Sequence, residues 1–275
     1  MSATPFLPPL PDTWEATRAT LHAYSHAATA VNRVHGTAHP KWWHVSLKVE
    51  PDGLATDPVP LPDGGTAGVR LDLLAGAVVF ETSDGERTEL DMTAGTTGTE
   101  MADAIIARYA DRGLTGDYDR SKFRNDDPRS YDAAAAAAFW RAETNVAAVF
   151  ERHRSSLGGE VGIVQLWPHN FDTSVEWFGT RVETYTEDGE TTEYPSQLNL
   201  GFYPGGDRPY FYSNPWPFEE SLVDSELPHG AAWHTEGWQG TILHYDQLAG
   251  DPDAERKLAD YAAAVFRLAS PTLTA

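Results

Sequence analysis

A chain of 275 residues with 41% hydrophobic and 11% aromatic residues has the composition of a globular protein that can bury a substantial core. Its formal net charge of −21 at pH 7 argues against nucleic acid or an anionic membrane surface as a partner. The complete absence of cysteine excludes disulfides, thiolate metal ligands and cysteine nucleophiles.

Neither a membrane segment nor a secretory signal is recognisable in the sequence. No apolar run approaches the roughly 18 residues that span a bilayer, and the first ten residues lack a basic start and an apolar core. We therefore expect a cytoplasmic protein. The acidic excess has two explanations that the sequence leaves open, adaptation to high salt and the codon usage of a GC-rich genome.

The first part of the chain predicts a long helix followed by strands. A helix is expected over about 13–35, with Asp12 and Glu15 as a capping box at its start. Alternating apolar residues predict a strand over 42–49. Three further strands are expected at 69–74, 77–82 and 88–92.

Local signals also place the next turn and helix. Asp84-Gly85 predicts a hairpin turn between the last two of these strands. Thr97 and Glu100 have the spacing of a second capping box, and the helix that they begin is expected to end at Gly113. The polar segment 115–129 follows as a surface loop or linker.

The second part predicts one long helix, a strand-rich region and a C-terminal helix. The alanine-rich segment 131–156 predicts the long helix, and Asp251 with Pro252 predicts the start of the last one. Asp188-Gly189 predicts a hairpin turn. Strands are expected at 161–167, 175–185, 197–203, 210–213 and 240–244.

These elements indicate an α+β fold with mostly antiparallel sheets flanked by helices, because strands cluster without strict helix–strand alternation. We expect one domain over 1–275, within which 12–114 and 130–270 are candidate subdomains of similar organisation. No linker of domain scale separates the two halves.

The segment Leu166–Asp172, with the sequence Leu-Trp-Pro-His-Asn-Phe-Asp, is the strongest candidate for a functional turn. If the chain turns at Pro168, His169 and Asp172 can face the same space as a catalytic base with its orienting acid, or as half of a metal site. The competing interpretation is structural, with Asp172 capping a turn and His169 forming ordinary contacts.

A functional site at this turn would need further polar groups, and His22 and His44 are the candidates to complete it. Aromatic residues in the second half could line a groove for a flat ligand or could fill the core instead. They are Tyr203, Tyr210, Tyr212, Trp216, Trp233 and Trp238. Asn199 could present its amide to the same ligand.

Several segments resemble an uncharacterised family of actinobacterial and archaeal proteins that is catalogued as domain of unknown function number 5996. The segments are Thr20–His22, Trp43–Leu47, Gly53–Thr56, Leu166–Asp172, Leu200–Gly206 and Tyr210–Pro217. The resemblance extends from about Trp14 to Tyr245 and implies a single coherent domain, but it implies no activity.

Three functional hypotheses follow. The chain could be a small-molecule enzyme, a hydrolase or lyase that uses His169 and Asp172; a non-catalytic module that binds a small molecule; or a structural or interaction protein whose aromatic residues form the core. The nucleophile elbow GxSxG, the zinc motif HExxH and the dinucleotide motif GxGxxG are all absent. The sequence names no cofactor and leaves metal binding and the oligomeric state open.

Overall fold

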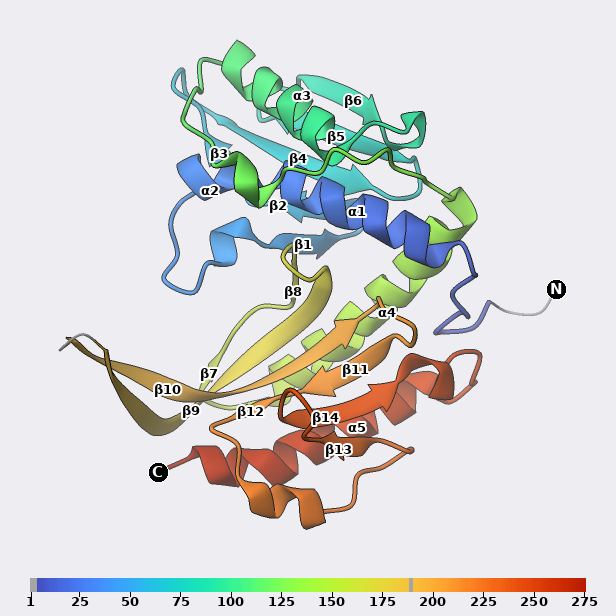
Figure 1. The fold of residues 1–275 in the computed structure, drawn as a ribbon, viewed down its shortest axis with the longest axis vertical. Coiled ribbons are helices and arrows are strands. Elements are labelled where there is room, and N and C mark those ends of the chain that lie inside the picture. Colours follow the sequence, from blue (N-terminus) through green and yellow to red (C-terminus); the bar gives the residue numbers. More distant parts are fainter. Residues whose placement is uncertain (1–3, 188–189) are drawn as a thin grey trace. The chain divides into compact units, whose positions relative to one another are not determined.

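The computed structural model describes residues 4–187 and 190–275. The fold is α+β with antiparallel strand pairing, as the sequence predicts (Figure 1). Contacts divide the chain into two units. The N-terminal unit comprises 10–144 and 165–172, and the C-terminal unit comprises 1–9, 145–164 and 173–275. The single domain predicted over 1–275 stays a prediction.

An antiparallel sheet forms the centre of the N-terminal unit. Its strands lie in the order β8-β1-β2-β4-β5-β6, and β3 also pairs with β4. Their bounds are β1 (Leu47–Glu50), β2 (Gly53–Thr56), β3 (Val59–Pro60), β4 (Thr66–Asp72), β5 (Ala77–Thr82), β6 (Arg87–Asp91) and β8 (Gln165–Trp167). The β5–β6 turn lies at Asp84-Gly85 as predicted, with Gly85 at φ 95°.

The helices of this unit include α1 (Trp14–Ala28), α2 (Asn32–His35), α3 (Gly98–Asp111) and the first half of α4 (Ala133–Ser156). Helix α1 packs against α3 and strand β4. The predicted capping box of α3 is confirmed, because Thr97 Oγ1 accepts from the Glu100 amide at 3.1 Å and Glu100 Oε2 accepts from the Thr97 amide at 2.9 Å. Short 3₁₀ helices lie at Trp43–Val45, Met92–Ala94 and Arg120–Lys122.

Three local predictions for this unit were wrong. Thr13 rather than Asp12 occupies the N-cap of α1, and its side chain makes no capping hydrogen bond. The predicted helix over 13–35 is interrupted by a turn at 29–31. The first half of the predicted strand over 42–49 is a 3₁₀ turn, because Trp42 adopts the left-handed conformation at φ 60°.

The C-terminal unit contains a second group of antiparallel strands. They lie in the order β13-β14-β11-β10-β9, with β12 paired to β10 and β7 paired to β9. Their bounds are β7 (Glu160–Val161), β9 (Asp172–Glu187), β10 (Glu190–Tyr203), β11 (Tyr210–Ser213), β12 (Pro215–Trp216), β13 (Ala232–His234) and β14 (Gly240–His244). Strands β11 and β14 match their predicted ranges.

The register of these strands gives the sheet two chemically different faces. Phe202 pairs with Phe211, which pairs with Leu243 on β14, and all three are fully buried. This apolar face is covered by α5 (Ala254–Ala269), where the Tyr261 hydroxyl lies 2.6 Å from Thr241 Oγ1. The opposite face presents half-exposed aromatic side chains.

The remaining predictions for this half have mixed outcomes. The long helix predicted over 131–156 is α4. The single strand predicted over 161–167 is divided into β7 and β8. Asp253, not Asp251, is the N-cap of α5, because the Asp251 carboxylate instead accepts from the Asp253 amide and pairs with Lys257. The predicted turn at Asp188-Gly189 lies outside the described residues. Among the residues that are described, no helix has the length and apolar character needed to cross a membrane.

Candidate functional site

The turn that follows β8 has an unusual backbone. The Phe171 amide donates to the Trp167 carbonyl at 2.8 Å, which closes a five-residue turn through Pro168, His169 and Asn170. Phe171 has φ 58°, a conformation that a bulky residue rarely adopts. Such a backbone persists only where surrounding contacts hold it, and it is common at functional sites.

Aromatic packing supplies those contacts. Phe171 is fully buried, with its ring centroid 5.6 Å from that of Phe139, which in turn stacks on Trp14 at 4.5 Å. The ring of His22 also lies 6.0 Å from that of Phe171. The turn is therefore anchored to α1 and α4 by its last residue, while His169 is exposed at its tip.

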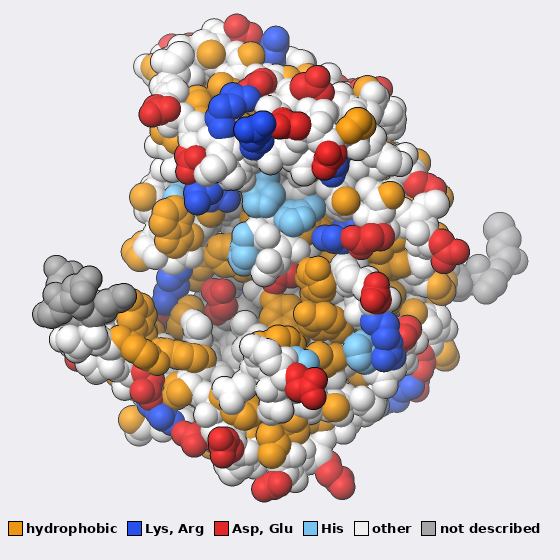
Figure 2. Space-filling model, viewed as in Figure 1, with side chains coloured by type: hydrophobic (Ala, Val, Ile, Leu, Met, Phe, Trp, Pro, Cys, Tyr) orange, Lys and Arg blue, Asp and Glu red, His pale blue; other side chains and the backbone are white. Residues whose placement is uncertain are grey.

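Three histidines of the N-terminal unit meet at this place, and we call them the histidine cluster: His22, His26 and His169. His22 and His26 lie one turn apart on α1, with ring centroids 5.0 Å apart. His169 acts electrostatically on both of them. Figure 2 shows histidine side chains gathered on one face of the protein. The cluster brings together two histidines that the sequence singled out, His22 and His169.

Two ring nitrogens of the cluster are buried and have no hydrogen-bond partner among the described residues. They are His22 Nε2 and His26 Nδ1. Most buried polar atoms in proteins are paired, so two such atoms on adjacent side chains call for an explanation. A bound molecule would supply the missing partners.

Burial keeps both rings neutral near pH 7. It lowers the pKa of His26 to about 4, and the neighbouring charges of His22, Arg33 and His169 act in the same direction. Burial, followed by the Arg18 charge, also lowers the pKa of His22, although the nearby backbone of His169 and Pro168 opposes this. A neutral imidazole can donate through one nitrogen and accept through the other.

Sequence reasoning missed His26, although the signal was present. His22 and His26 stand four residues apart in a segment with helical periodicity, which places both side chains on one face. The spacing would have identified His26 as soon as His22 was chosen.

Asp172 and His44 are buried, whereas His169 is exposed. Asp172 is buried at the first position of β9, with 6% of its surface exposed. The buried His44 ring accepts the His39 amide at its Nδ1 atom, 3.2 Å away, and it stacks on Trp42. The hydrogen bond that His44 accepts from His39 therefore stabilises the loop that precedes β1.

The other predicted ligand-binding residues belong to the C-terminal unit. Tyr212 packs across Gly201, where an added Cβ would lie 2.2 Å from the tyrosine ring. Tyr203 lies 5.4 Å from Tyr210 across the β10–β11 pair, and the Tyr210 ring stacks on Trp238 at 6.4 Å. These residues form an aromatic face on the side of the sheet opposite α5: Tyr203, Tyr210, Tyr212 and Trp238.

Asn199 and Trp216 differ in what they contact. The Asn199 side-chain oxygen accepts from the Asn214 amide at 2.7 Å, so it joins β10 to the segment after β11. Trp216 stacks on Tyr185 at 6.0 Å and lies edge-on to Tyr194 at 6.5 Å. Tyr185 and Tyr194 are about half exposed, so this second aromatic group lies at the surface of the β9–β10 hairpin.

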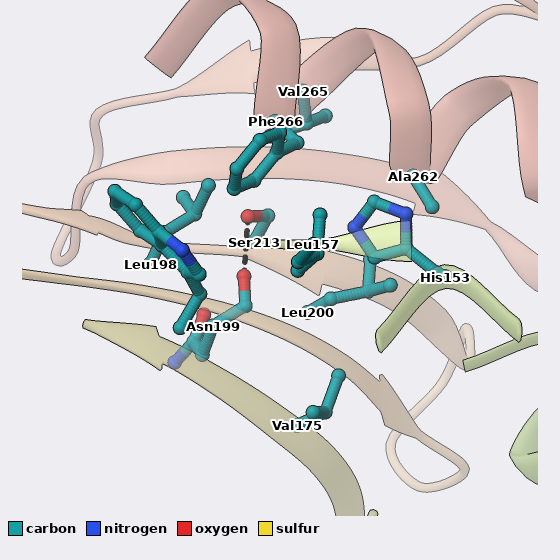
Figure 3. Close-up of a pocket in the computed structure, with 11 residues that line it drawn as sticks. His153, Leu157, Val175, Leu198, Asn199, Leu200, Ser213, Ala262, Val265 and Phe266 are labelled. Atoms are coloured by element: carbon teal, nitrogen blue, oxygen red, sulfur yellow. Dashed lines mark hydrogen bonds between the residues drawn. The ribbon is translucent and has the colours of Figure 1, made fainter. Parts of the chain in front are cut away.

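A small cavity lies between the apolar side of this sheet and the helices α4 and α5 (Figure 3). Its volume of about 10 Å³ is roughly the space for one water molecule, which is far too small for an organic ligand. His153 lines it and packs edge-on against Phe266 at 5.9 Å, and burial lowers the pKa of His153. His153 is thus a partly buried histidine with an ordinary packing role.

An open groove of about 560 Å³ runs beside α5 and contains His229 and Asp260. His229 Nε2 lies 3.0 Å from Asp260 Oδ2, and Arg256 contacts the same oxygen at 2.9 Å. Asp260 therefore already has an ion pair with Arg256 and a hydrogen bond with His229 at an exposed position, where such contacts contribute little. We regard this pair as part of the surface charge pattern.

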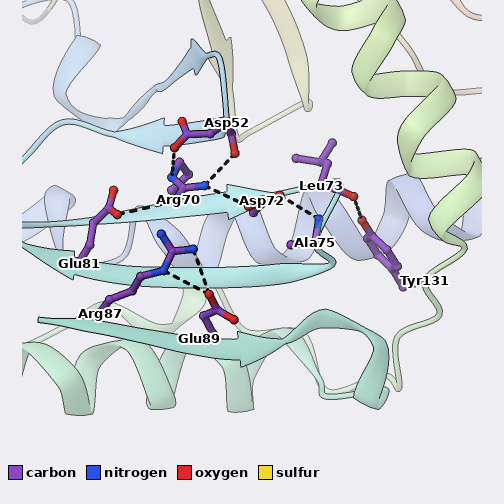
Figure 4. Close-up of polar contacts among 9 residues, drawn as sticks. All are labelled: Asp52, Arg70, Asp72, Leu73, Ala75, Glu81, Arg87, Glu89 and Tyr131. Atoms are coloured by element: carbon purple, nitrogen blue, oxygen red, sulfur yellow. Dashed lines mark hydrogen bonds and ion pairs between the residues drawn. The ribbon is translucent and has the colours of Figure 1, made fainter.

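One buried arginine of the N-terminal unit, Arg70, is surrounded by carboxylates (Figure 4). The Arg70 side chain is only 4% exposed and lies within 3.6 Å of three carboxylates. They belong to Asp52, Asp72 and Glu81. The Asp52 carbonyl also accepts from Arg70 Nη1 at 2.8 Å. This arrangement satisfies the charge within the fold.

The half metal site considered from the sequence, His169 with Asp172, stays a prediction. Across 4–187 and 190–275, no group of three or more His, Asp or Glu side chains is placed to hold a metal ion.

Fold and site together define an α+β protein with antiparallel sheet and a cluster of histidines beside a strained turn. The chain belongs to the family of unknown function DUF5996, whose family model matches residues 7–274 and confirms the resemblance seen in the sequence. Comparison with curated proteins and with solved structures finds no match.

Proposed function

We propose that the chain binds a small organic molecule at the histidine cluster. The observation that carries this proposal is the pair of buried, unpartnered nitrogens, His22 Nε2 and His26 Nδ1, on rings 5.0 Å apart. Leaving a buried polar atom without a partner costs about 1–3 kcal/mol. A ligand that donates to or accepts from these nitrogens recovers that cost on binding.

The catalytic form of this proposal gives His169 the role of base. His169 is exposed on a turn whose backbone is held by Phe171, so its imidazole can reach a bound molecule without disturbing the core. It would accept a proton from the substrate or from a water molecule, as a hydrolase or lyase requires. Asp172 would support the protonated ring as its negatively charged partner.

Histidine ring signals in NMR spectra of the full chain test the proposal. A library of small polar organic molecules should contain compounds that shift the ring signals of His22 and His26. The variant His22→Gln/His26→Gln should lose this binding by at least about tenfold, because two hydrogen-bonding rings are removed. His153→Gln is the matched control, because His153 is also a partly buried histidine but lines the small apolar cavity instead of the histidine cluster.

Two outcomes contradict the proposal. One is a library that leaves the rings of His22 and His26 unperturbed. The other is a set of ligands that bind the double variant as tightly as they bind the original protein. The thermal unfolding of each variant shows separately whether its fold is intact.

A second candidate is a binding module that uses the aromatic face of the C-terminal unit. Its support is the close grouping of half-exposed rings, with Tyr210 and Tyr212 6.1 Å apart and both 6.4 Å from Trp238. Flat ligands such as sugars stack on faces of this kind. Ligand-induced changes in tryptophan fluorescence that Trp238→Leu removes, with unchanged histidine signals, would favour this candidate over the histidine cluster.

A further inference from the structure

Arg33 lies beyond His26 on the same helical path, and the described residues give it no counter-ion in direct contact. It belongs to α2, and its amide donates to the Thr29 carbonyl at 3.2 Å, which carries the helical course on from α1. Its Nε atom is buried without a hydrogen-bond partner among those residues. The Nε atom of Arg70 also lacks a hydrogen-bond partner, but Figure 4 shows that carboxylates surround that arginine.

A partly buried guanidinium without a counter-ion is energetically unfavourable, because charges lose hydration on burial. Burial accordingly lowers the pKa of Arg33, and only Asp119 acts in the other direction. The Oδ1 atom of Asp119 already accepts from the backbone amide and the hydroxyl of Ser121. Arg33 therefore forms no direct ion pair among the described residues, and Asp119 acts on it only through longer-range attraction.

The surroundings of His26 reinforce this pattern. The charged groups that act on it are His22, Arg33 and His169, and none of them is acidic. Those that act on His22 are Arg18 and His169. Glu15 pairs with Arg18 and Asp119 acts on Arg33, but the charged groups that act on the two histidine rings are all basic. In a chain whose formal net charge is −21, such a local group of bases favours an anion.

We infer that the ligand of the proposed function carries an oxyanion, a carboxylate or a phosphate, which the Arg33 guanidinium and the His26 imidazole bind. This inference rests on the proposed function and specifies its ligand class. A guanidinium offers a planar pair of N–H donors that matches two oxygens of either group. The buried nitrogens of His26 and His22 lie further along the same helical path and supply further donors.

Three probes test the inference on the full chain. Benzoate carries a carboxylate, benzamide is its neutral counterpart, and inorganic phosphate carries the second type of oxyanion. Titration with benzoate or phosphate should shift the ring signals of His26 and His22, while benzamide should shift them much less. The stronger of the two anions identifies which oxyanion the site prefers.

Substitutions assign the effect to Arg33. Arg33→Gln should weaken binding of the anion by at least about tenfold, and Arg33→Lys should weaken it less because the charge remains. Arg124→Gln is the control, because Arg124 is an exposed arginine that pairs only with Asp126 in the described contacts and should bind as the original protein does.

Each remaining outcome overturns the inference. If benzamide binds as well as benzoate and Arg33→Gln changes nothing, a small-molecule site exists but does not require an oxyanion. If neither benzoate nor phosphate perturbs the rings at about 100 mM, far above a millimolar Kd, the oxyanion inference fails. The library experiment then decides the proposed function by itself.

Discussion

Arg70 and Arg33 are two arginines of the same unit that the fold treats in opposite ways. The buried Nε atoms of both arginines lack a hydrogen-bond partner among the described residues, so the difference lies in the counter-ions. Arg70 lies on β4 among three carboxylates within 3.6 Å, whereas Arg33 on α2 forms no direct ion pair with a described residue. The charge of the first arginine is balanced without any ligand. The second becomes complete only when an acceptor arrives, so the comparison separates a structural charge from a binding charge.

The largest expected effect is the difference in unfolding free energy between the variants in which each arginine is replaced by methionine. Arg70→Met should lower the free energy of unfolding by about 2–4 kcal/mol, because three carboxylates then repel one another around an apolar side chain. Arg33→Met should change it by less than about 1 kcal/mol, since no ion pair is lost. Urea unfolding at pH 7 measures both values, and equal losses in the two variants would remove the distinction.

The histidine cluster should give the protein a pH-dependent stability. The pKa of His26 is about 4 in the folded chain, against an ordinary histidine value of 6.5, so the unfolded state binds more protons between these two values. The stabilising contribution is complete above about pH 6.5 and is lost as the pH falls towards 4. It amounts to about 1–3 kcal/mol, since His26 is only partly buried.

The variant His26→Gln isolates this contribution. It should flatten part of the fall in unfolding free energy between pH 6.5 and 4, whereas Arg33→Gln should raise the pKa of His26 because a neighbouring positive charge is removed. Urea unfolding at several pH values and the NMR titration of the His26 ring check the two statements. An unchanged stability profile in His26→Gln would show that the ring does not titrate in this way.

A smaller effect concerns salt. If the acidic surface reflects adaptation to salt, the melting temperature should rise by several °C between low salt and about 1 M sodium chloride, because screening relieves self-repulsion. At equal ionic strength, phosphate should add an increment that Arg33→Gln abolishes. A flat melting temperature would favour codon usage as the origin of the acidity, and an increment that survives in Arg33→Gln would place the anion elsewhere.

Local signals in the sequence predicted much of the fold. Short segments rich in apolar and aromatic residues identified β5, β11 and β14, and the Thr97–Glu100 spacing identified the start of α3. The failures occurred where tertiary contacts decide the backbone. Trp42 adopts φ 60° beside His44, although alternation alone favours a strand there.

The site was predictable only in part for a related reason. His22 and His169 stand in distinctive segments, and the fold joins them through Phe171. Arg33 looked ordinary, yet it had a detectable signal, because no acidic residue stands three or four positions away from it. Arg18, by contrast, has Glu15 three residues before it and pairs with it at 2.5 Å. The lack of a direct ion pair to Arg33 among the described residues could not be read from the sequence.

The Nε–H resonance of Arg33 gives the most direct test of the central claim that this arginine is a binding charge. In a 15N-correlated NMR spectrum, phosphate or benzoate should shift and sharpen the Arg33 signal while the Arg70 signal stays in place, because Arg70 already has its carboxylates. If the Arg33 signal does not respond, or if both arginine signals move together, the account is contradicted.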